Sequence, residues 1–157
     1  MTGRITIRDA VPADAAQACD VMRRSIAELC VADHANDSAI LTRWLANKRP
    51  EITATWISQA NGSLLVAIED DRVLAVGGVF DSGEITLNYV SPDARFRGIS
   101  KAMLRALEVR AKERGATRCT LLSTQTAYRF YKAAGYVDEG APINKVGSPA
   151  QPMAKEI

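Results

Sequence analysis

Apolar residues recur with two different spacings along this chain, and each spacing predicts a different kind of element. Residues 4–8 and 84–89 alternate between polar and apolar side chains, which is the spacing of β-strands. Residues 13–30 and 99–114 carry apolar side chains three or four positions apart, as amphipathic helices do. The same spacings, with capping and turn residues at their ends, predict further helices at about 36–45, 51–59 and 126–134, and further strands at 64–69, 72–80, 117–123, 136–137 and 152–157.

Glycine, proline and acidic residues mark the connections between these elements. Asp70-Asp71 predicts a hairpin between two strands, and Gly77-Gly78 within the second strand predicts a bulge or a close approach of another element. The stretch 141–151 is rich in proline, glycine and small residues, so we expect a long loop there.

Composition narrows the class of protein. A length of 157 residues predicts a single domain over residues 1–157, and a hydrophobic fraction of 47% is ordinary for a soluble protein. A net charge of +2 is too small to predict a nucleic-acid partner. Three widely spaced cysteines favour reduced thiols in a cytoplasmic protein, and one histidine makes a metal site unexpected. We find no run that predicts a membrane span or a secretory leader.

The most informative stretch joins the strand at 84–89 to the helix at 99–114. Ser91-Pro92-Asp93 ends the strand, and a loop with Arg95, Arg97 and Gly98 leads into the helix. The first turn of a helix exposes N–H groups with partial positive charge, and glycine lets a phosphate approach them. The loop therefore predicts a pyrophosphate site; the alternative is an ordinary strand-to-helix connection with solvated arginines.

The spacing Arg95-x-x-Gly98-x-Ser100 resembles the acyl-CoA pyrophosphate loop of the GNAT superfamily of N-acyltransferases, usually written Arg/Gln-x-x-Gly-x-Gly/Ala. Ser100 departs from the pattern but is small enough to leave the backbone accessible. The order of elements resembles the family along nearly the whole chain. The resemblance implies an α/β fold with a mixed, mostly antiparallel central sheet of about seven strands and helices on both faces.

The resemblance also implies acetyl-CoA as cosubstrate, with no metal. By position, the residues expected to bind it are Tyr89, Val90, Arg95, Phe96, Arg97, Gly98, Ile99, Ser100, Lys101, Thr124 and Tyr131. Thr124 stands where the family often has asparagine, so its contact with the pantetheine arm is the weakest part of the match.

A second motif, residues 127–136, resembles the family signature Ala-x-x-Phe-Tyr-x-x-x-Gly-Phe/Tyr. It implies that Tyr131 lies near the thioester sulfur and protonates the leaving thiolate. A tyrosine with a pKa of about 10 is a workable donor to a thiolate whose acid has a pKa of about 8.5. The alternative is an amphipathic helix with aromatic residues in the core, which we expect for Phe130.

Glu84 is the candidate general base, because it stands at the offset where the histone-modifying branch of the family carries one. One alternative is that Glu84 is a solvated carboxylate and water is the base. Another is that His34 acts as the base or contacts the substrate, although a capping or structural role is also open to it. Strand alternation places Glu84 with Thr86 and Asn88 on one face, opposite Ile85, Leu87 and Tyr89.

Other groups have weaker signals. The resemblance implies a backbone N–H of Asn88, Tyr89 or Val90 as donor to the oxyanion. Trp44 and Trp56 are expected in the core, with an acceptor pocket as the alternative. Cys119, the only cysteine expected near the cofactor, lies in an apolar strand and is not expected to be a nucleophile.

These observations together predict an N-acetyltransferase in which a primary amine of a small molecule or peptide attacks acetyl-CoA directly. The alternative is a non-catalytic acyl-CoA-binding or sensing module. A toxin-like member that acylates charged tRNA is disfavoured by the low net charge. No residue selects the acceptor amine or the acyl chain. A homodimer through the C-terminal strands is common in the family.

Overall fold

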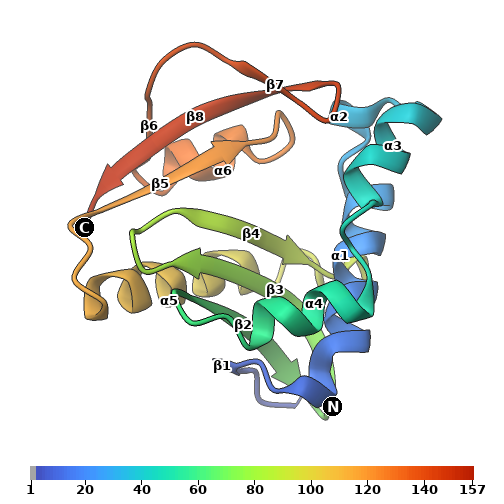
Figure 1. Ribbon diagram of the computed structural model, residues 1–157, viewed down its shortest axis with the longest axis vertical. Coiled ribbons are helices and arrows are strands. Elements are labelled where there is room, and N and C mark those ends of the chain that lie inside the picture. Colours follow the sequence, from blue (N-terminus) through green and yellow to red (C-terminus); the bar gives the residue numbers. More distant parts are fainter. Residues whose placement is uncertain (1–2) are drawn as a thin grey trace.

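The computed structural model describes residues 3–157 and contains two antiparallel sheets, which lie one above the other in Figure 1. The first sheet has the order β1-β2-β3-β4, formed by β1 (Thr6–Asp9), β2 (Gly62–Glu69), β3 (Arg72–Phe80) and β4 (Ile85–Val90). The hairpin between β2 and β3 turns at Asp70 and Asp71, whose φ angles are 49° and 62°. Two successive residues with positive φ match the right-handed twist of the strands, and the predicted hairpin is confirmed.

The second sheet has β8 (Ser148–Glu156) at its centre. It pairs with β5 (Arg118–Ser123), β6 (Val137–Asp138) and β7 (Ile143–Lys145). The expectation of a long loop over 141–151 is wrong, because β7 and the start of β8 form a hairpin there. Its two-residue turn is Val146-Gly147, with φ angles of 51° and 89°. The strands thus form two sheets, not one sheet of about seven.

Helices cover both faces of the first sheet. On one face lie α1 (Ala15–Leu29) and α4 (Pro50–Ile57), and on the other lies α5 (Ile99–Glu113), whereas α3 (Ser38–Leu45) packs beside the C-terminal end of α1. Two short helices, α2 (Val31–His34) and α6 (Tyr128–Ala133), and the 3-10 turns η1 (Pro12–Asp14) and η2 (Pro92–Ala94) complete the chain. The predicted mostly antiparallel α/β fold with helices on both faces is confirmed. Within residues 3–157 no helix combines the length and the apolar character that a bilayer crossing requires.

A bulge in β4 changes which way its side chains point. Gly78 pairs with Leu87, but the next residue, Val79, pairs with Ile85, so Thr86 is an extra residue. Ile85 consequently packs in the core beneath α5, whereas Leu87 packs in the core beneath α1. The expected common face of Ile85, Leu87 and Tyr89 is therefore wrong, because alternation fails across a bulge.

Gly77 explains how closely α5 lies against the sheet. A Cβ atom at this position would lie 2.6 Å from Sδ of Met103 and 3.0 Å from Cδ1 of Leu107. A side chain here would force Met103 and Leu107 to shift, so glycine permits the close approach of the helix that the sequence predicts. Gly77 thereby helps to set the position of α5 and of the loop that precedes it.

Candidate active site

A cavity of about 610 Å³ lies where β4 and β5 separate. The two strands are joined at one end by a parallel bridge between Glu84 and Thr120, and Figure 1 shows them diverging from there toward α1. The cavity brings together the loop after β4, the start of α5 and the start of α6. Its lining includes all but one of the predicted cofactor residues: Tyr89, Val90, Arg95, Phe96, Gly98, Ile99, Ser100, Lys101, Thr124 and Tyr131.

The loop before α5 leaves its backbone open. Gly98 is the N-cap of α5 with a φ of 75°, and nothing lies within 4 Å of the position a Cβ would take. Phe96 also has a positive φ, 62°, and its side chain is 92% exposed with the Arg95 guanidinium 4.5 Å from its ring centre. The first turn of a fifteen-residue helix thus presents free N–H groups to the cavity, with Arg95 and Lys101 beside them.

Arg97 is the predicted cofactor residue that does not line this cavity. Its guanidinium forms two hydrogen bonds with the Glu69 carboxylate, at 3.1 and 2.5 Å. The side chain therefore ties the loop to the end of β2 instead of facing an anion. Sequence spacing could not show this, because the carboxylate is 28 positions away along the chain.

Tyr131 projects its phenol into the cavity from α6. The side chain is only 6% exposed and packs edge-on against Phe130 and Tyr136. Its Oη accepts a hydrogen bond of 3.3 Å from Nδ2 of Asn88, so the phenol proton remains available for donation. Burial raises the pKa of Tyr131 to about 12, and the bond from Asn88 only partly opposes this.

The free edge of β4 presents backbone donors to the same cavity. Ser91 donates its N–H to the Leu74 carbonyl at 2.7 Å, which directs alternate N–H groups of β4 toward β3. By this alternation Tyr89 donates toward β3, whereas the N–H groups of Asn88 and Val90 point to the gap between β4 and β5. Of the three backbone donors that the resemblance implies, the geometry favours these two.

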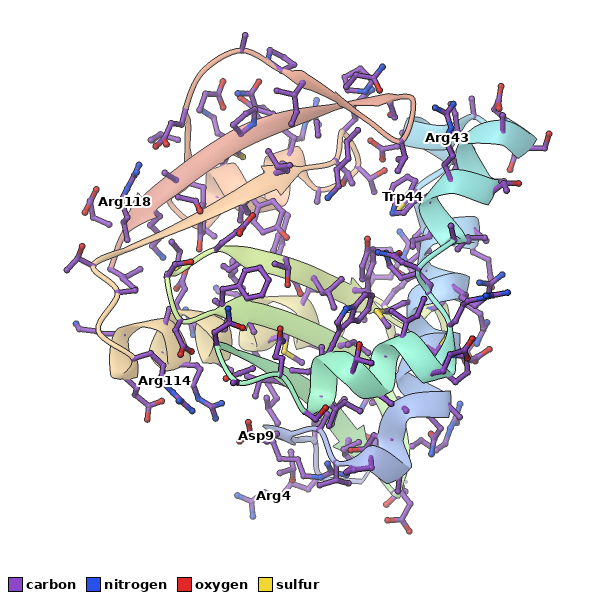
Figure 2. All side chains as sticks on the ribbon, viewed as in Figure 1. Arg4, Asp9, Arg43, Trp44, Arg114 and Arg118 are labelled. Atoms are coloured by element: carbon purple, nitrogen blue, oxygen red, sulfur yellow. The ribbon has the colours of Figure 1, made fainter. Side chains whose placement is uncertain are left out.

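Tyr89 contributes a second, half-buried phenol to the lining of the cavity. Its Oη accepts a hydrogen bond of 3.2 Å from Nε1 of Trp44, and burial raises the pKa of this tyrosine above its usual range. Figure 2 shows Trp44 on the side of α3 that faces the space between the two sheets. Trp44 is 8% exposed, so it belongs to the core as expected and also lines the cavity.

Asp33 is a site residue that the sequence analysis missed. Its carboxylate accepts hydrogen bonds from the backbone N–H groups of Gln125 and Thr126, at 2.6 and 3.2 Å, and from the Thr126 hydroxyl at 2.5 Å. The turn before α6 is therefore held by a side chain from α2. An Asp-His pair in a break between helices was the available signal, but its partners lie more than 90 positions away.

His34 has a structural role. Its Nδ1 accepts a hydrogen bond of 3.0 Å from the Asn36 N–H, so Nε2 carries the proton and donates to the Ile26 carbonyl at 2.8 Å. The ring is fully buried, and both nitrogens are occupied. This matches the expectation of a capping histidine and leaves no free nitrogen for a substrate.

Three other expectations change. Glu84 is exposed before the start of β4 and is not among the residues that line the cavity. The Oγ1 of Thr124 accepts the Ala127 N–H at 3.1 Å, which caps the turn before α6. The cysteine that lines the cavity is Cys30, not Cys119, and burial raises the pKa of Cys30 to about 12.

A second cavity of about 440 Å³ adjoins the first. The two share lining residues from α3, β4 and β7, among them Trp44, Leu87 and Tyr89. Trp56 lines the second cavity, with Nζ of Lys48 5.9 Å from its ring centre. The site therefore has two compartments that meet at β4.

Known proteins share both the sequence pattern and this architecture. The family model for the acetyltransferase (GNAT) domain matches residues 30–157. A search of curated proteins finds no match to the chain. Among solved structures, the chain is similar to a GCN5-related N-acetyltransferase from Rhodopseudomonas palustris, with a TM-score of 0.87 and 23% identity over 100% of this chain and 98% of that one.

Two further structures contain a cofactor. The PaiA N-acetyltransferase from Thermoplasma acidophilum, in complex with coenzyme A, has a TM-score of 0.81 and 20% identity, covering 98% of this chain and 99% of that one. The putative acetyltransferase YncA from Salmonella typhimurium, with acetyl-CoA, has a TM-score of 0.74 and 18% identity, covering 98% and 94%. At these identities the likeness shows a common fold.

Proposed function

Because this chain belongs to the GNAT family of acetyltransferases, we propose that it transfers the acetyl group of acetyl-CoA to a primary amine of a small molecule or peptide. We further propose that residues 1–157 act as one acyltransferase domain. One observation supports the assignment above all: an open glycine loop at the start of α5 and a buried phenol line the same cavity. The loop suits an anion, and the phenol suits a leaving group.

In this proposal the loop binds the pyrophosphate of acetyl-CoA. The N–H groups at the start of α5 and the side chains of Arg95, Ser100 and Lys101 supply donors and positive charge. The acyl arm then runs along the gap between β4 and β5, toward Tyr131. Arg97 supports the loop through Glu69 and does not contact the phosphates with its side chain.

The acceptor amine attacks the thioester carbonyl carbon directly, which forms a C–N bond and leaves negative charge on the carbonyl oxygen. In this proposal the backbone N–H groups of Asn88 and Val90, on the free edge of β4, donate to that oxygen. When the C–S bond breaks, the sulfur takes a proton from Tyr131, and solvent returns a proton to the phenolate. The products are the N-acetyl amine and coenzyme A.

The proton that the amine loses passes to water in this mechanism. Glu84 lies outside the cavity lining, and both ring nitrogens of His34 are already hydrogen-bonded. A covalent acetyl-enzyme is not part of the proposal, because thiolates are the nucleophilic form and Cys30, with its raised pKa, remains a thiol near neutral pH.

The proposed function is tested by measuring whether the protein turns over acetyl-CoA in the presence of amines. Incubation with acetyl-CoA and an amine library should release free thiol, with matching N-acetyl products identified by mass spectrometry. The second candidate, a non-catalytic acyl-CoA-binding module, predicts saturable acetyl-CoA binding without thiol release on any amine. Absence of acetyl-CoA binding would overturn both.

A further inference from the structure

The second cavity has an unusual balance of charge. Three cationic side chains line it, Arg43 from α3, Lys48 after α3 and Lys145 from β7, and no Asp or Glu is among its lining residues. Within residues 3–157 none of these three cations takes part in an ion pair. The cavity therefore carries uncompensated positive charge.

Of the three cations, Lys48 incurs the largest free-energy penalty for desolvation, because it is the most buried. Lys48 is only 6% exposed, and its Nζ donates a hydrogen bond of 2.7 Å to the side-chain oxygen of Asn47, not to a carboxylate. Burial, followed by repulsion from Lys145, lowers the pKa of Lys48 to about 8. A buried cation normally requires an opposite charge nearby, and an anion in this cavity would supply one.

The rest of the lining is apolar and aromatic. Trp44, Trp56, Leu64 and Phe80 line the cavity beside the three cations. A volume of about 440 Å³ lies within the range of small-molecule sites, which is about 300–1,000 Å³. The lining thus suits a small molecule that has one anionic group and one apolar group.

We propose that the acceptor is a small amine that carries a carboxylate and an apolar side chain, as an apolar amino acid does. This inference rests on the proposed acetyl transfer. The carboxylate lies among Arg43, Lys48 and Lys145, and the apolar group packs against Trp44, Trp56 and Phe80. The two cavities meet beside Tyr89, so the amine of such a molecule can point into the first cavity while its carboxylate stays in the second.

The same charges act against other amines that acetyltransferases could use. A polyamine or an aminoglycoside carries several positive charges near neutral pH, which Arg43, Lys48 and Lys145 would repel. Neither has an apolar group for the aromatic walls. Charge and lining therefore disfavour both classes at this site.

Matched pairs of acceptors test the proposal. Phenylalanine and phenethylamine, tryptophan and tryptamine, and leucine and isopentylamine differ within each pair by one carboxylate. Thiol release should show a kcat/KM higher by roughly ten- to a hundred-fold for the amino acid in at least one pair, the effect of a charge-assisted hydrogen bond. Equal or lower values for the amino acid in all three pairs would overturn the proposal, as would a preference for spermine.

Variants identify the site. Lys145→Gln and Lys48→Met should each lower kcat/KM more for the preferred amino acid than for its decarboxylated partner. Lys145 is exposed on a short strand, so its substitution tests the idea even if the Lys48 variant fails to fold. Lys112→Gln is the matched control, because Lys112 lies on α5 and lines neither cavity. Equal losses with both members of a pair would refute a carboxylate site.

A binding measurement separates this inference from the proposed function. If no amine is acetylated, the proposed function fails, and calorimetry with N-acetylphenylalanine and N-acetylphenethylamine then decides the inference alone. Tighter binding of the carboxylate compound, lost in Lys145→Gln, supports an anionic acceptor site. Equal binding of the two compounds overturns it.

Discussion

Tyr131→Phe is the most direct test of the proposed chemistry. The substitution removes one oxygen atom from a side chain that is 6% exposed and leaves its ring packing against Phe130 and Tyr136 intact. The Asn88 amide loses one acceptor but lies in a half-buried position where water can replace it. We therefore expect the fold to persist and the leaving group to lose its proton donor.

The expected fall in kcat depends on how closely the pKa of Tyr131 matches the pKa of the leaving thiol. Proton transfer is efficient when donor and acceptor have similar pKa values, and an exposed thiol with a pKa of about 8.5 would be mismatched to Tyr131. Burial raises the pKa of Cys30, a thiol on the wall of this cavity, so we expect burial to raise the pKa of a coenzyme A thiol bound there as well. We expect kcat to fall by roughly 100-fold, within the usual range for general acids of about 10²–10⁴.

The raised pKa also predicts a pH profile. The phenol must be protonated to act, and a pKa of about 12 keeps it protonated through neutral and moderately alkaline pH. Wild-type kcat should show no decline assignable to Tyr131 below about pH 11, because the donor form is lost only near its pKa. The variant should lower kcat by the same factor at every pH in that window.

Single-turnover rates measured by thiol release separate chemistry from product release. KM for acetyl-CoA should change little, because the phenol acts on the leaving sulfur. Tyr128→Phe is the matched control: it removes a hydroxyl from the same helix that donates to Asp138 at 2.8 Å and lies outside the cavity lining. A fall of less than about threefold in the Tyr131 variant, or an equal fall in the control, would refute general-acid catalysis by Tyr131.

Three other predictions follow from the loop, the sheet and the cavity thiol. Arg95→Gln should raise KM for acetyl-CoA by about tenfold with little change in kcat, because it removes a phosphate contact. Arg97→Gln should raise KM less, because Glu69 holds the Arg97 side chain away from the phosphates. A larger rise in KM for the Arg97 variant than for the Arg95 variant would contradict the loop geometry. Gly77→Ala should lower the free energy of unfolding by about 1–3 kcal/mol, because the added methyl group overpacks against α5. Thermal unfolding measures this, and an unchanged Tm would show that α5 can shift to accommodate the methyl group without cost. Cys30→Ser should retain acetylation, and the intact mass of wild type after incubation with acetyl-CoA should show no acetyl adduct; an adduct lost in the variant would indicate a covalent route.

Local patterns in the sequence were sufficient to predict most helices and strands. Periodicity predicted α1 and α5, because a helix that packs on one face of a sheet must repeat its apolar side chains with the helical period. Asp70-Asp71 predicted the β2–β3 turn for a similarly local reason. The loop ending at Gly98 could be predicted because its arginines, its glycine and their spacing lie within a few residues.

Long-range contacts explain what the sequence analysis missed. The bulge at Thr86 depends on how β4 pairs with β3, and it reversed the side of the sheet on which Ile85 lies. The β7–β8 hairpin depends on pairing that a run of small residues conceals. The partner of Arg97, the support that Asp33 gives to α6, and the choice of Cys30 over Cys119 all depend on residues distant in sequence.

By itself, then, the sequence determined most of the order of elements, the loop chemistry at Gly98 and the candidate acid Tyr131, because each is encoded within one turn, strand or helix. Only the tertiary structure decided that these groups share one cavity, that Glu84 does not, and that three cations line the compartment next to it. The physical reason is that acidity and charge recognition depend on burial and on neighbours through space, which a linear pattern does not specify.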